Sequence, residues 1–188
     1  MATSTGACAV MRFADPDRLR VLEEIYDLYK DKVFGLAWKL TGDRQEAEDL
    51  THDVFIRVHE HLDQFEGRSE MGTWIYRIAT NLCFNRMRRM RRASFVEAIE
   101  RTFGLVGREK PNDARLLEDE TRAVVLEAVR ELPPAFRACI ALRDLEGFSY
   151  REIAEILQVP EGTVMSRLAR ARERLRQKLS RLHRAGQP

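Results

Sequence analysis

The sequence has little of what a disulfide framework or a membrane segment needs. Its three cysteines, Cys8, Cys83 and Cys139, are odd in number, lie far apart and form no CxxC pair, so neither a set of disulfides nor a zinc knuckle is indicated. No apolar run approaches the roughly 18 to 20 residues of a membrane-spanning helix. The N-terminal residues MATSTGACAVMRF lack a basic segment before an apolar one. These absences predict a cytoplasmic protein without membrane insertion.

Residues that would carry out catalysis or hold a cofactor are also sparse. The four histidines are His52, His59, His61 and His183. His52 and His59 are seven residues apart and can share a helical face, but no adjacent cysteine completes a metal site. The sequence also has no glycine-rich phosphate loop. We therefore expect no enzyme activity, no metal and no cofactor.

The chain as a whole lacks a large excess of either charge, but individual segments do carry one. The 188 residues carry a net charge of only +2, so composition alone does not indicate a nucleic-acid-binding protein. Residues 43–66 nevertheless hold eight acidic residues against two arginines, and residues 161–184 hold eight basic residues against two glutamates. Five more arginines lie within residues 86–92. This segregation favours partners of opposite charge at different faces, with ordinary solvated surface as the alternative in each case.

The spacing of apolar residues predicts helices. Strand signals are almost absent, and the i, i+3, i+4, i+7 pattern runs through most of the chain. The sequence therefore predicts an all-α protein of two small helical domains joined by a flexible linker. In the first domain, residues 16–92, one helix begins at Pro16 behind Asp15 and a second restarts at Asp43. A polar loop at 63–69 precedes a third helix over about 72–92.

Residues 93–115 are the predicted linker, which ends in the turn-prone segment EKPND. Apolar residues within it allow part of it to be helical, and we expect it to be ordered only when something binds it. The second domain, residues 116–182, follows. Its predicted helices lie near residues 116–131, 134–145, 149–157 and 161–182.

Residues 148–175 have the spacing of a helix-turn-helix. We expect Ile153, Ala154 and Leu157 to point inward from a short first helix, with the small Ala154 allowing close packing. A tight turn then leads to a long second helix that opens at Pro160.

The second helix of this unit has one apolar and one polar side. The polar side is free to enter a DNA groove, and the helix start offers backbone N–H groups to a phosphate. The candidate DNA-contacting residues are Gly162, Thr163, Ser166, Arg167, Arg170 and Arg174, with Arg181 further along the same side. The alternative is an ordinary helical hairpin with a basic exposed face.

The third helix of the first domain also has two opposite faces. At about 100° per residue, the predicted buried face contains Ile75, Ile78, Ala79 and Leu82. The opposite face contains Trp74, Arg77, Asn81, Asn85, Arg88 and Arg92. An aromatic ring, amides and guanidinium groups in one stripe predict a surface for unstacked, single-stranded nucleic acid. The alternative is that Trp74 completes the core and the arginines are merely solvated.

The acidic second helix carries a stripe of its own. Asp49, Asp53, Ile56 and Glu60 follow one another at i, i+4, i+7 and i+11, away from the apolar row. A basic partner helix would fit this stripe, and solvated surface is the alternative.

Two long segments together resemble a known family. LTGDRQEAEDLTHDVFIRVHEHLDQFEGRSEMGTWIYRIATNLCFNRMRR is followed by ELPPAFRACIALRDLEGFSYREIAEILQVPEGTVMSRLARARERLRQKL. Both segments, in this order, resemble the extracytoplasmic-function (ECF) sigma factors of bacterial RNA polymerase. The resemblance covers about residues 20–92 as region 2 and 116–182 as region 4. It implies a transcription initiation factor that binds core polymerase and directs it to promoters.

For region 2, the resemblance implies contact with the clamp helices of the polymerase β′ subunit through Asp49, Asp53 and Ile56. It also implies recognition and melting of the −10 element, with a flipped base held by the loop around Phe65 and by Asn81. The full set of expected −10 contacts is Phe65, Trp74, Arg77, Asn81, Asn85 and Arg88.

For region 4, the resemblance implies that duplex DNA of the −35 element is read by the helix that begins at Pro160, with Ser166, Arg167 and Arg170 nearest the bases. The polymerase β subunit and an anti-sigma factor are implied as further partners. The sequence departs from the family pattern at His52, where glutamine is usual, and at Met165, where a basic residue is common. Since Met165 cannot hydrogen-bond a base, the resemblance does not determine the preferred −35 sequence.

Two rival classes remain at this stage. A transcription regulator with a LuxR-like helix-turn-helix shares the EIAxxL…TV pattern, but it would not explain the stripe around Trp74. An enzyme would need a catalytic constellation, which the histidines do not supply. A sigma factor joins its two DNA-reading domains by a tether, so that both promoter elements are bound together only on the polymerase. The free protein should therefore bind DNA poorly.

Overall fold

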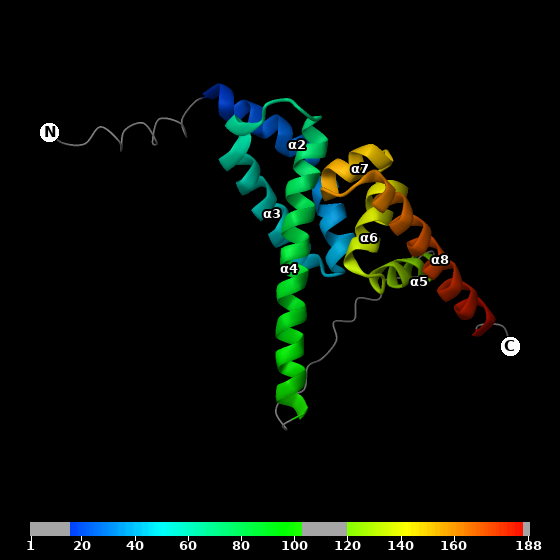
Figure 1. The fold of residues 1–188 in the computed structure, drawn as a ribbon. Coiled ribbons are helices and arrows are strands. Elements are labelled where there is room, and N and C mark those ends of the chain that lie inside the picture. The colour runs from blue at the N-terminus through cyan, green and yellow to red at the C-terminus, as the bar shows by residue number, and fades with distance from the viewer. Residues whose placement is uncertain (1–15, 103–119, 186–188) are drawn as a thin grey trace.

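The structure, a computed structural model, describes residues 16–102 and 120–185 (Figure 1). Over these residues it contains helices and no strands, which confirms the predicted all-α fold. The N-terminal half consists of α2 (Pro16–Thr41), α3 (Arg44–His61), the single turn η1 (Leu62–Gln64) and α4 (Met71–Thr102). The C-terminal half consists of α5 (Glu120–Arg130), α6 (Pro134–Ile140), η2 (Ala141–Leu145), α7 (Tyr150–Leu157) and α8 (Glu161–Ala185). None of the described helices is long and apolar enough to cross a bilayer.

The break between α2 and α3 lies where the sequence predicts it. Gly42 ends α2 with a φ of +78°, a conformation that glycine adopts without strain. A side chain here would also collide with Arg130, whose Nε would lie 2.8 Å from the added Cβ. Asp43 then caps α3, since its Oδ1 accepts a hydrogen bond from the Glu46 backbone N–H at 3.0 Å.

Helix α4 is longer than expected. The sequence predicts a helix to about residue 92, whereas α4 continues to Thr102. Its C-terminal part extends away from the other helices in Figure 1. Residues 91–102, RRASFVEAIERT, contain no glycine or proline, so nothing in the local sequence ends the helix. The rest of the predicted linker lies outside the described residues.

The predicted helix over 134–145 changes its winding within the chain. After Ile140 the backbone opens into η2, a π-helical turn. The Glu146 N–H bonds to the carbonyl oxygen of Ala141 at 3.1 Å, and the Phe148 N–H bonds to that of Leu142 at 3.0 Å. These wider turns bring Glu146 and Phe148 to the side of the C-terminal half that faces α2 and α4, where both contact the N-terminal half.

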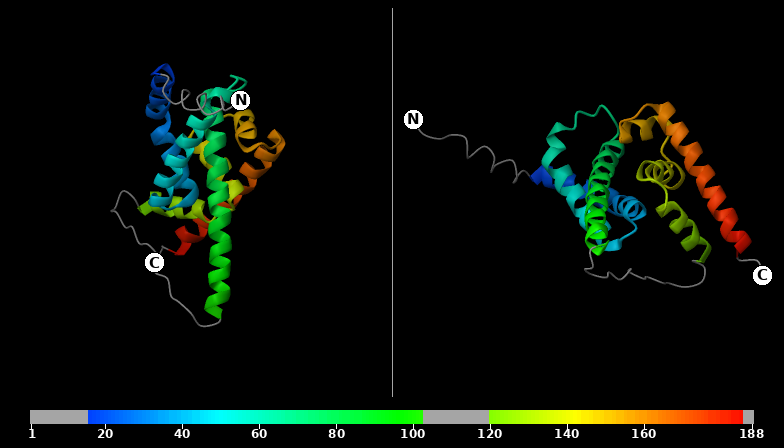
Figure 2. Two further views of the ribbon diagram at one scale, coloured as in Figure 1. Left: turned by 90° about the vertical axis from the view of Figure 1, so that its left-hand side faces the viewer. Right: turned by 60° about the horizontal axis from the view of Figure 1, so that its bottom comes forward.

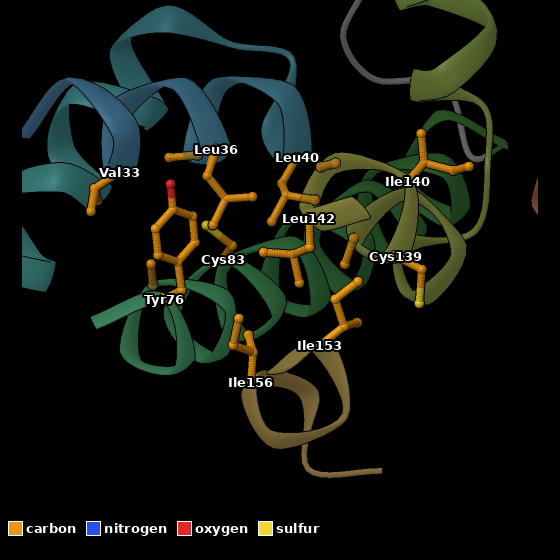
Figure 3. Close-up of a cluster of buried hydrophobic side chains, with 14 of the residues drawn as sticks. Val33, Leu36, Leu40, Tyr76, Cys83, Cys139, Ile140, Leu142, Ile153 and Ile156 are labelled. Carbon is orange, nitrogen blue, oxygen red and sulfur yellow. The ribbon is translucent and has the colours of Figure 1, made fainter. Parts of the chain in front are cut away.

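The two halves share one hydrophobic core. Helix α4 lies between α2 and α3 on one side and α7 on the other (Figure 2). Side chains from both halves meet in one cluster, labelled in Figure 3, in which Leu36, Leu40, Leu142, Ile153 and Ile156 are fully buried. Two domains are present as predicted, but they pack directly against each other.

Helix α7 shows the effect of this packing. We expected Ile153, Ala154 and Leu157 to point inward, whereas the fully buried residues of α7 are Ile153 and Ile156. Ala154 and Leu157 are only partly buried. The pattern within the helix-turn-helix does not account for Ile156, because its cover comes from α4 of the other half.

The start of α7 gives a test of local stability. Ser149 and Glu152 form a capping box: the Glu152 N–H donates to Ser149 Oγ at 3.2 Å, and the Ser149 N–H donates to Glu152 Oε2 at 2.7 Å. Ser149→Ala should lower the free energy of unfolding by about 1 kcal/mol. Urea unfolding at pH 7 measures this loss. Ser149→Asp, which keeps a capping oxygen, is the matched control and should stay close to the wild type.

The same variant should change the pH dependence of stability. Hydrogen bonds from the Ser149 side chain and backbone hold the pKa of Glu152 below its ordinary value. The capping box therefore stabilises the folded state above the unfolded pKa of about 4.3, and this contribution disappears as the pH falls through the lowered folded-state pKa. In Ser149→Ala this acid-sensitive contribution should shrink. An unchanged difference between wild type and variant across this range would contradict the assignment.

Candidate nucleic-acid interface

A pocket lies beside the loop between α3 and α4. Phe65 and Trp74 lie side by side in it, with ring centroids 5.4 Å apart and planes inclined by 50°. Arg77 lines the same pocket, whose volume is about 480 Å³. The remaining lining residues are Gln64, Glu66, Arg68 and Ser69 from the loop, and Glu155 and Gln158 from α7 and its end. Two aromatic rings and a guanidinium at one opening suit a base taken out of its stack.

The exposed face of α4 continues from this pocket. Asn81, Asn85 and Arg88 are exposed, one to three turns beyond Arg77 on the face of the helix that carries Trp74. Arg77 is half-buried, and its Nε is buried without a hydrogen-bond partner. The structure therefore brings the predicted aromatic and guanidinium residues together and leaves the two amides open to solvent.

The acidic stripe on α3 is exposed, as predicted from its spacing. Asp49, Asp53 and Ile56 are all accessible, and Ile56 keeps 43% of its surface open although it is apolar. The sequence did not reveal that Arg86 of α4 reaches this stripe, where it pairs with Glu46 and lies 3.6 Å from Asp49. The hydrogen bond with Glu46 is the main reason that the pKa of Arg86 is raised.

The turn between α7 and α8 has the geometry of a helix-turn-helix. Gln158 adopts the left-handed conformation with φ +52°, and the Val159 N–H donates to the carbonyl oxygen of Ala154 at 3.1 Å. Helix α8 then begins at Glu161 and exposes Gly162, Ser166 and Arg170 to solvent. A row of polar and basic side chains is thus presented from the first turns of α8.

Two of the predicted DNA-contacting arginines also touch side chains of α6. Arg167 is half-buried against α6, where its guanidinium contacts the thiol of Cys139. Arg174, one heptad later, lies over the ring of Phe136 with its guanidinium carbon 5.2 Å from the ring centroid. Both flank the apolar row of α8 that packs on α6, but Arg174 remains exposed whereas Arg167 does not. Met165 is 52% exposed next to Ser166.

The buried thiols are poorly suited to reaction. Burial raises the pKa of Cys83 to about 12, and burial raises that of Cys139 to about 11 although the Arg167 guanidinium acts against it. A thiol at these values carries almost no thiolate near neutrality. Within residues 16–102 and 120–185, no three histidine, cysteine or acidic side chains converge as a metal site would require. Cys8 lies outside the described residues.

Comparison with known families identifies the class. Residues 25–93 match the model for sigma-70 region 2, and residues 122–175 match the model for sigma-70 region 4. These two matches, together with the helical fold, define a sigma-70-type transcription initiation factor.

Named relatives narrow the class further. The chain is 35% identical to the ECF RNA polymerase sigma factor SigW of Bacillus subtilis over 164 residues, covering 83% of this chain and 87% of that one. It is 39% identical to the RNA polymerase sigma-H factor of Pseudomonas aeruginosa, covering 77% and 79%. It is 36% identical to the ECF sigma-E factor of Escherichia coli K12, covering 82% and 84%. The protein belongs to the ECF sigma factor family.

Solved structures agree with this placement. The sigma factor RpoE of Bartonella quintana, in complex with the anti-sigma factor NepR, superposes with a TM-score of 0.67 at 26% identity, over 84% of this chain and 96% of that one. CnrH, in complex with the cytosolic domain of CnrY, superposes with a TM-score of 0.62 at 20% identity over 95% and 96%, and shows the shared fold.

Membership of the family establishes the biochemical role. The protein is a promoter-specific initiation factor that binds RNA polymerase and DNA, and it is not an enzyme. The rival class, a regulator that shares only the helix-turn-helix, is wrong because region 2 is present as well.

Proposed function

We propose that residues 16–92 act as region 2, which recognises and melts the −10 element, and that residues 116–182 act as region 4, which reads the −35 element, with 93–115 as the linker. The observation that carries the proposal is the pair Phe65 and Trp74 at a pocket that Arg77 also lines, with the exposed amide of Asn81 about one turn further along α4. Duplex readers do not need such a pocket. A protein that captures single-stranded DNA does.

The melting step follows from the contents of this pocket. A base taken out of the duplex loses a few kcal/mol of stacking and pairing. Stacking on an aromatic side chain returns about 1 to 3 kcal/mol per base, and Phe65 and Trp74 offer such surfaces. Asn81 can hydrogen-bond an extruded base, and Arg77, Asn85 and Arg88 line the path of the strand. No nucleotide hydrolysis is needed.

In the C-terminal half, the start of α8 is the proposed −35 reader. The backbone N–H of Gly162 and the hydroxyl of Thr163 hold a phosphate and fix the position of the helix in the groove. The Thr163 N–H itself already donates to the carbonyl oxygen of Pro160 at 2.9 Å. Ser166 and Arg170 then face the bases, since both are exposed in the first three turns. Arg167 and Arg174 lie at the edge of this face, where we assign them to the DNA backbone.

The acidic stripe is the proposed contact with polymerase. Asp49, Asp53 and Ile56 offer two carboxylates and one exposed apolar side chain on one face of α3. This combination fits the clamp helices of the β′ subunit, and region 4 would contact the β subunit. Since polymerase and promoters are cytoplasmic in bacteria, we assign the protein to the cytoplasm. The complexes of related sigma factors support an anti-sigma factor as a further partner.

Transcription with purified components tests this division of labour. Promoters are first selected from genomic fragments with core polymerase and this protein, and run-off transcription is then measured on templates in which one element is replaced at a time. Replacing either element should remove most of the product. Pre-melting the −10 region should restore product only when the −35 element is intact. Promoter-independent transcription would contradict the proposal.

The polymerase face gives a prediction of its own. Reversing both Asp49 and Asp53 to lysine places like charges against a basic partner, which costs several kcal/mol. Co-purification with core polymerase should fall at least about tenfold, equivalent to 1.4 kcal/mol, while the helical circular dichroism stays unchanged. The matched control reverses Glu23 and Glu24, two exposed acidic residues of α2. Equal loss in both double variants would contradict a specific contact.

The melting pocket predicts a defect in one step only. Asn81→Ala removes a contact made to an extruded base, so closed complexes should form normally and strand opening should slow. Permanganate footprinting on the selected promoter follows the opening. A template that is already unpaired over the −10 region should rescue the variant. If it does not, Asn81 acts elsewhere.

The recognition helix predicts a contrast between two exposed arginines. Arg170→Ala should cost about 1 to 3 kcal/mol on the correct −35 sequence and relax discrimination at one base position. Arg181 lies three turns further along α8, beyond the groove, so Arg181→Ala should at most weaken binding to all sequences alike. Holoenzyme binding to single-base −35 variants at several salt concentrations separates the two effects. Uniform weakening by Arg170→Ala would contradict base reading.

A further inference from the structure

The outward side of α8 is polar along one row and apolar along the next. The buried residues of this helix include Val164, Leu168 and Ala171. On the opposite side, exposed residues recur at i, i+3, i+4, i+7 and i+8, namely Gly162, Met165, Ser166, Ala169 and Arg170. At about 100° per residue, Ser166 and Arg170 form one row, and Met165 and Ala169 form a second row beside it. We call Met165 and Ala169 the exposed apolar pair.

The longer member of this pair is open to solvent. Met165 keeps 52% of its surface exposed. A Cβ added at Gly162, one turn earlier on the same side, would meet no described atom within 4 Å, so the surface beside Met165 is uncovered there. A flexible thioether of this kind adapts its shape to an apolar partner, and it gains free energy when that partner removes it from water. The pair therefore offers a contact that the protein itself does not use.

Polar residues that could reach the same base pair are engaged within the protein. The hydroxyl of Ser166 donates to the carbonyl oxygen of Thr163 at 3.0 Å. Arg172 lies two turns beyond Met165 on its side of α8, and its Nη2 donates to Oδ1 of Asp144 at 2.6 Å. The thioether of Met165 is thus the group with the most direct access to a base edge at this position.

The chemistry of the major groove determines which base suits such a group. Thymine alone presents a methyl group there, whereas guanine presents two acceptors, O6 and N7. A basic side chain would pair with guanine, but Met165 has no donor and would leave both acceptors unpaired on burial, which is costly. A thymine methyl needs no hydrogen bond and can pack against the thioether and the methyl of Ala169. The exposed apolar pair therefore favours thymine and disfavours guanine.

We propose that Met165, supported by Ala169, is a specificity-determining residue that recognises the C5-methyl group of one thymine in the −35 element. Ser166 and Arg170 face the neighbouring bases. The inference rests on the proposed role of α8 as the −35 reader, and it assigns the chemistry of one base pair that the family resemblance does not determine. The −35 elements that this protein selects should share a thymine at one position.

Removal of the methyl group from the DNA tests the contact without any change to the protein. Holoenzyme binding is measured by competition on the selected promoter, with each thymine of the −35 element on either strand replaced in turn by deoxyuridine. Deoxyuridine pairs identically and lacks only the C5-methyl group. Affinity should fall about fourfold at one position, as expected for one buried methyl-sized group. If that position holds cytosine instead, its replacement by 5-methylcytosine should raise the affinity by a similar factor.

Variants of Met165 separate a direct contact from an effect of the methyl group on DNA shape. Met165→Ala should weaken binding to the thymine template about fourfold and make the deoxyuridine replacement ineffective, so the two losses should not add. Met165→Leu stays apolar and should keep the discrimination, whereas Met165→Gln, similar in length but polar, should lose it. Met90→Ala, at an exposed methionine of α4, is the matched control and should leave the discrimination unchanged.

The remaining outcomes contradict the inference in distinguishable ways. A −35 element without thymine, or one in which no deoxyuridine replacement weakens binding, would overturn the proposal. An equal deoxyuridine loss in wild type and Met165→Ala would also overturn it, because the methyl group would then act through DNA shape. Arg170→Ala on the same templates separates this inference from the proposed function. If only Arg170→Ala relaxes discrimination, α8 reads the element and the methyl contact is wrong. If neither variant changes discrimination at any position, α8 is not the −35 reader.

Discussion

A carboxylate that leaves water must be paired, and Glu146 finds both of its partners, Lys39 and Tyr76, in the other half of the chain. This pairing also affects Tyr76. Burial and the hydrogen bond to Glu146 raise the pKa of the Tyr76 phenol far above its ordinary value, so the phenol remains a hydrogen-bond donor at any physiological pH. Around this group the two halves share one core. Neither half can be described alone, because α4 covers the buried Ile156 and Tyr76 packs against the partly buried Phe148.

The local sequence was sufficient to predict where the helices lie, but it was insufficient to predict which helices pack against each other. Apolar spacing predicted α2, α3, α7 and α8 nearly to the residue, since a helix depends on neighbours within four positions, and Asp43 and Gly42 marked a boundary through backbone chemistry. The length of α4 was underestimated. A run of arginines gives no stop signal, and only a glycine or proline would have given one.

The candidate sites show the same difference between features set by the local sequence and features set by distant segments. The stripe of Asp49 and Asp53 is exposed as its spacing implied, whereas the contact between Phe65 and Trp74 was not foreseen. Further features escaped prediction because each depends on contact between distant segments. Arg86 pairs with α3, 40 residues earlier in the chain. Arg167 turns toward Cys139, and α7 covers the edge of the −10 face. Periodicity reports which residues share a face of one helix, and it does not report which helix covers that face.

The π-helical turn η2 determines the rotational register of everything that follows it. A π turn holds one residue more than the corresponding α turn, and one residue corresponds to about 100° of rotation about the helix axis. With a regular α-helix from Pro134 onward, the Glu146 carboxylate would face about a quarter turn away from Lys39 and Tyr76. One additional residue within Ala141–Leu145 thus sets the direction in which the Glu146 carboxylate meets both of these side chains, and a lineage that lost that residue would lose the direction along with it.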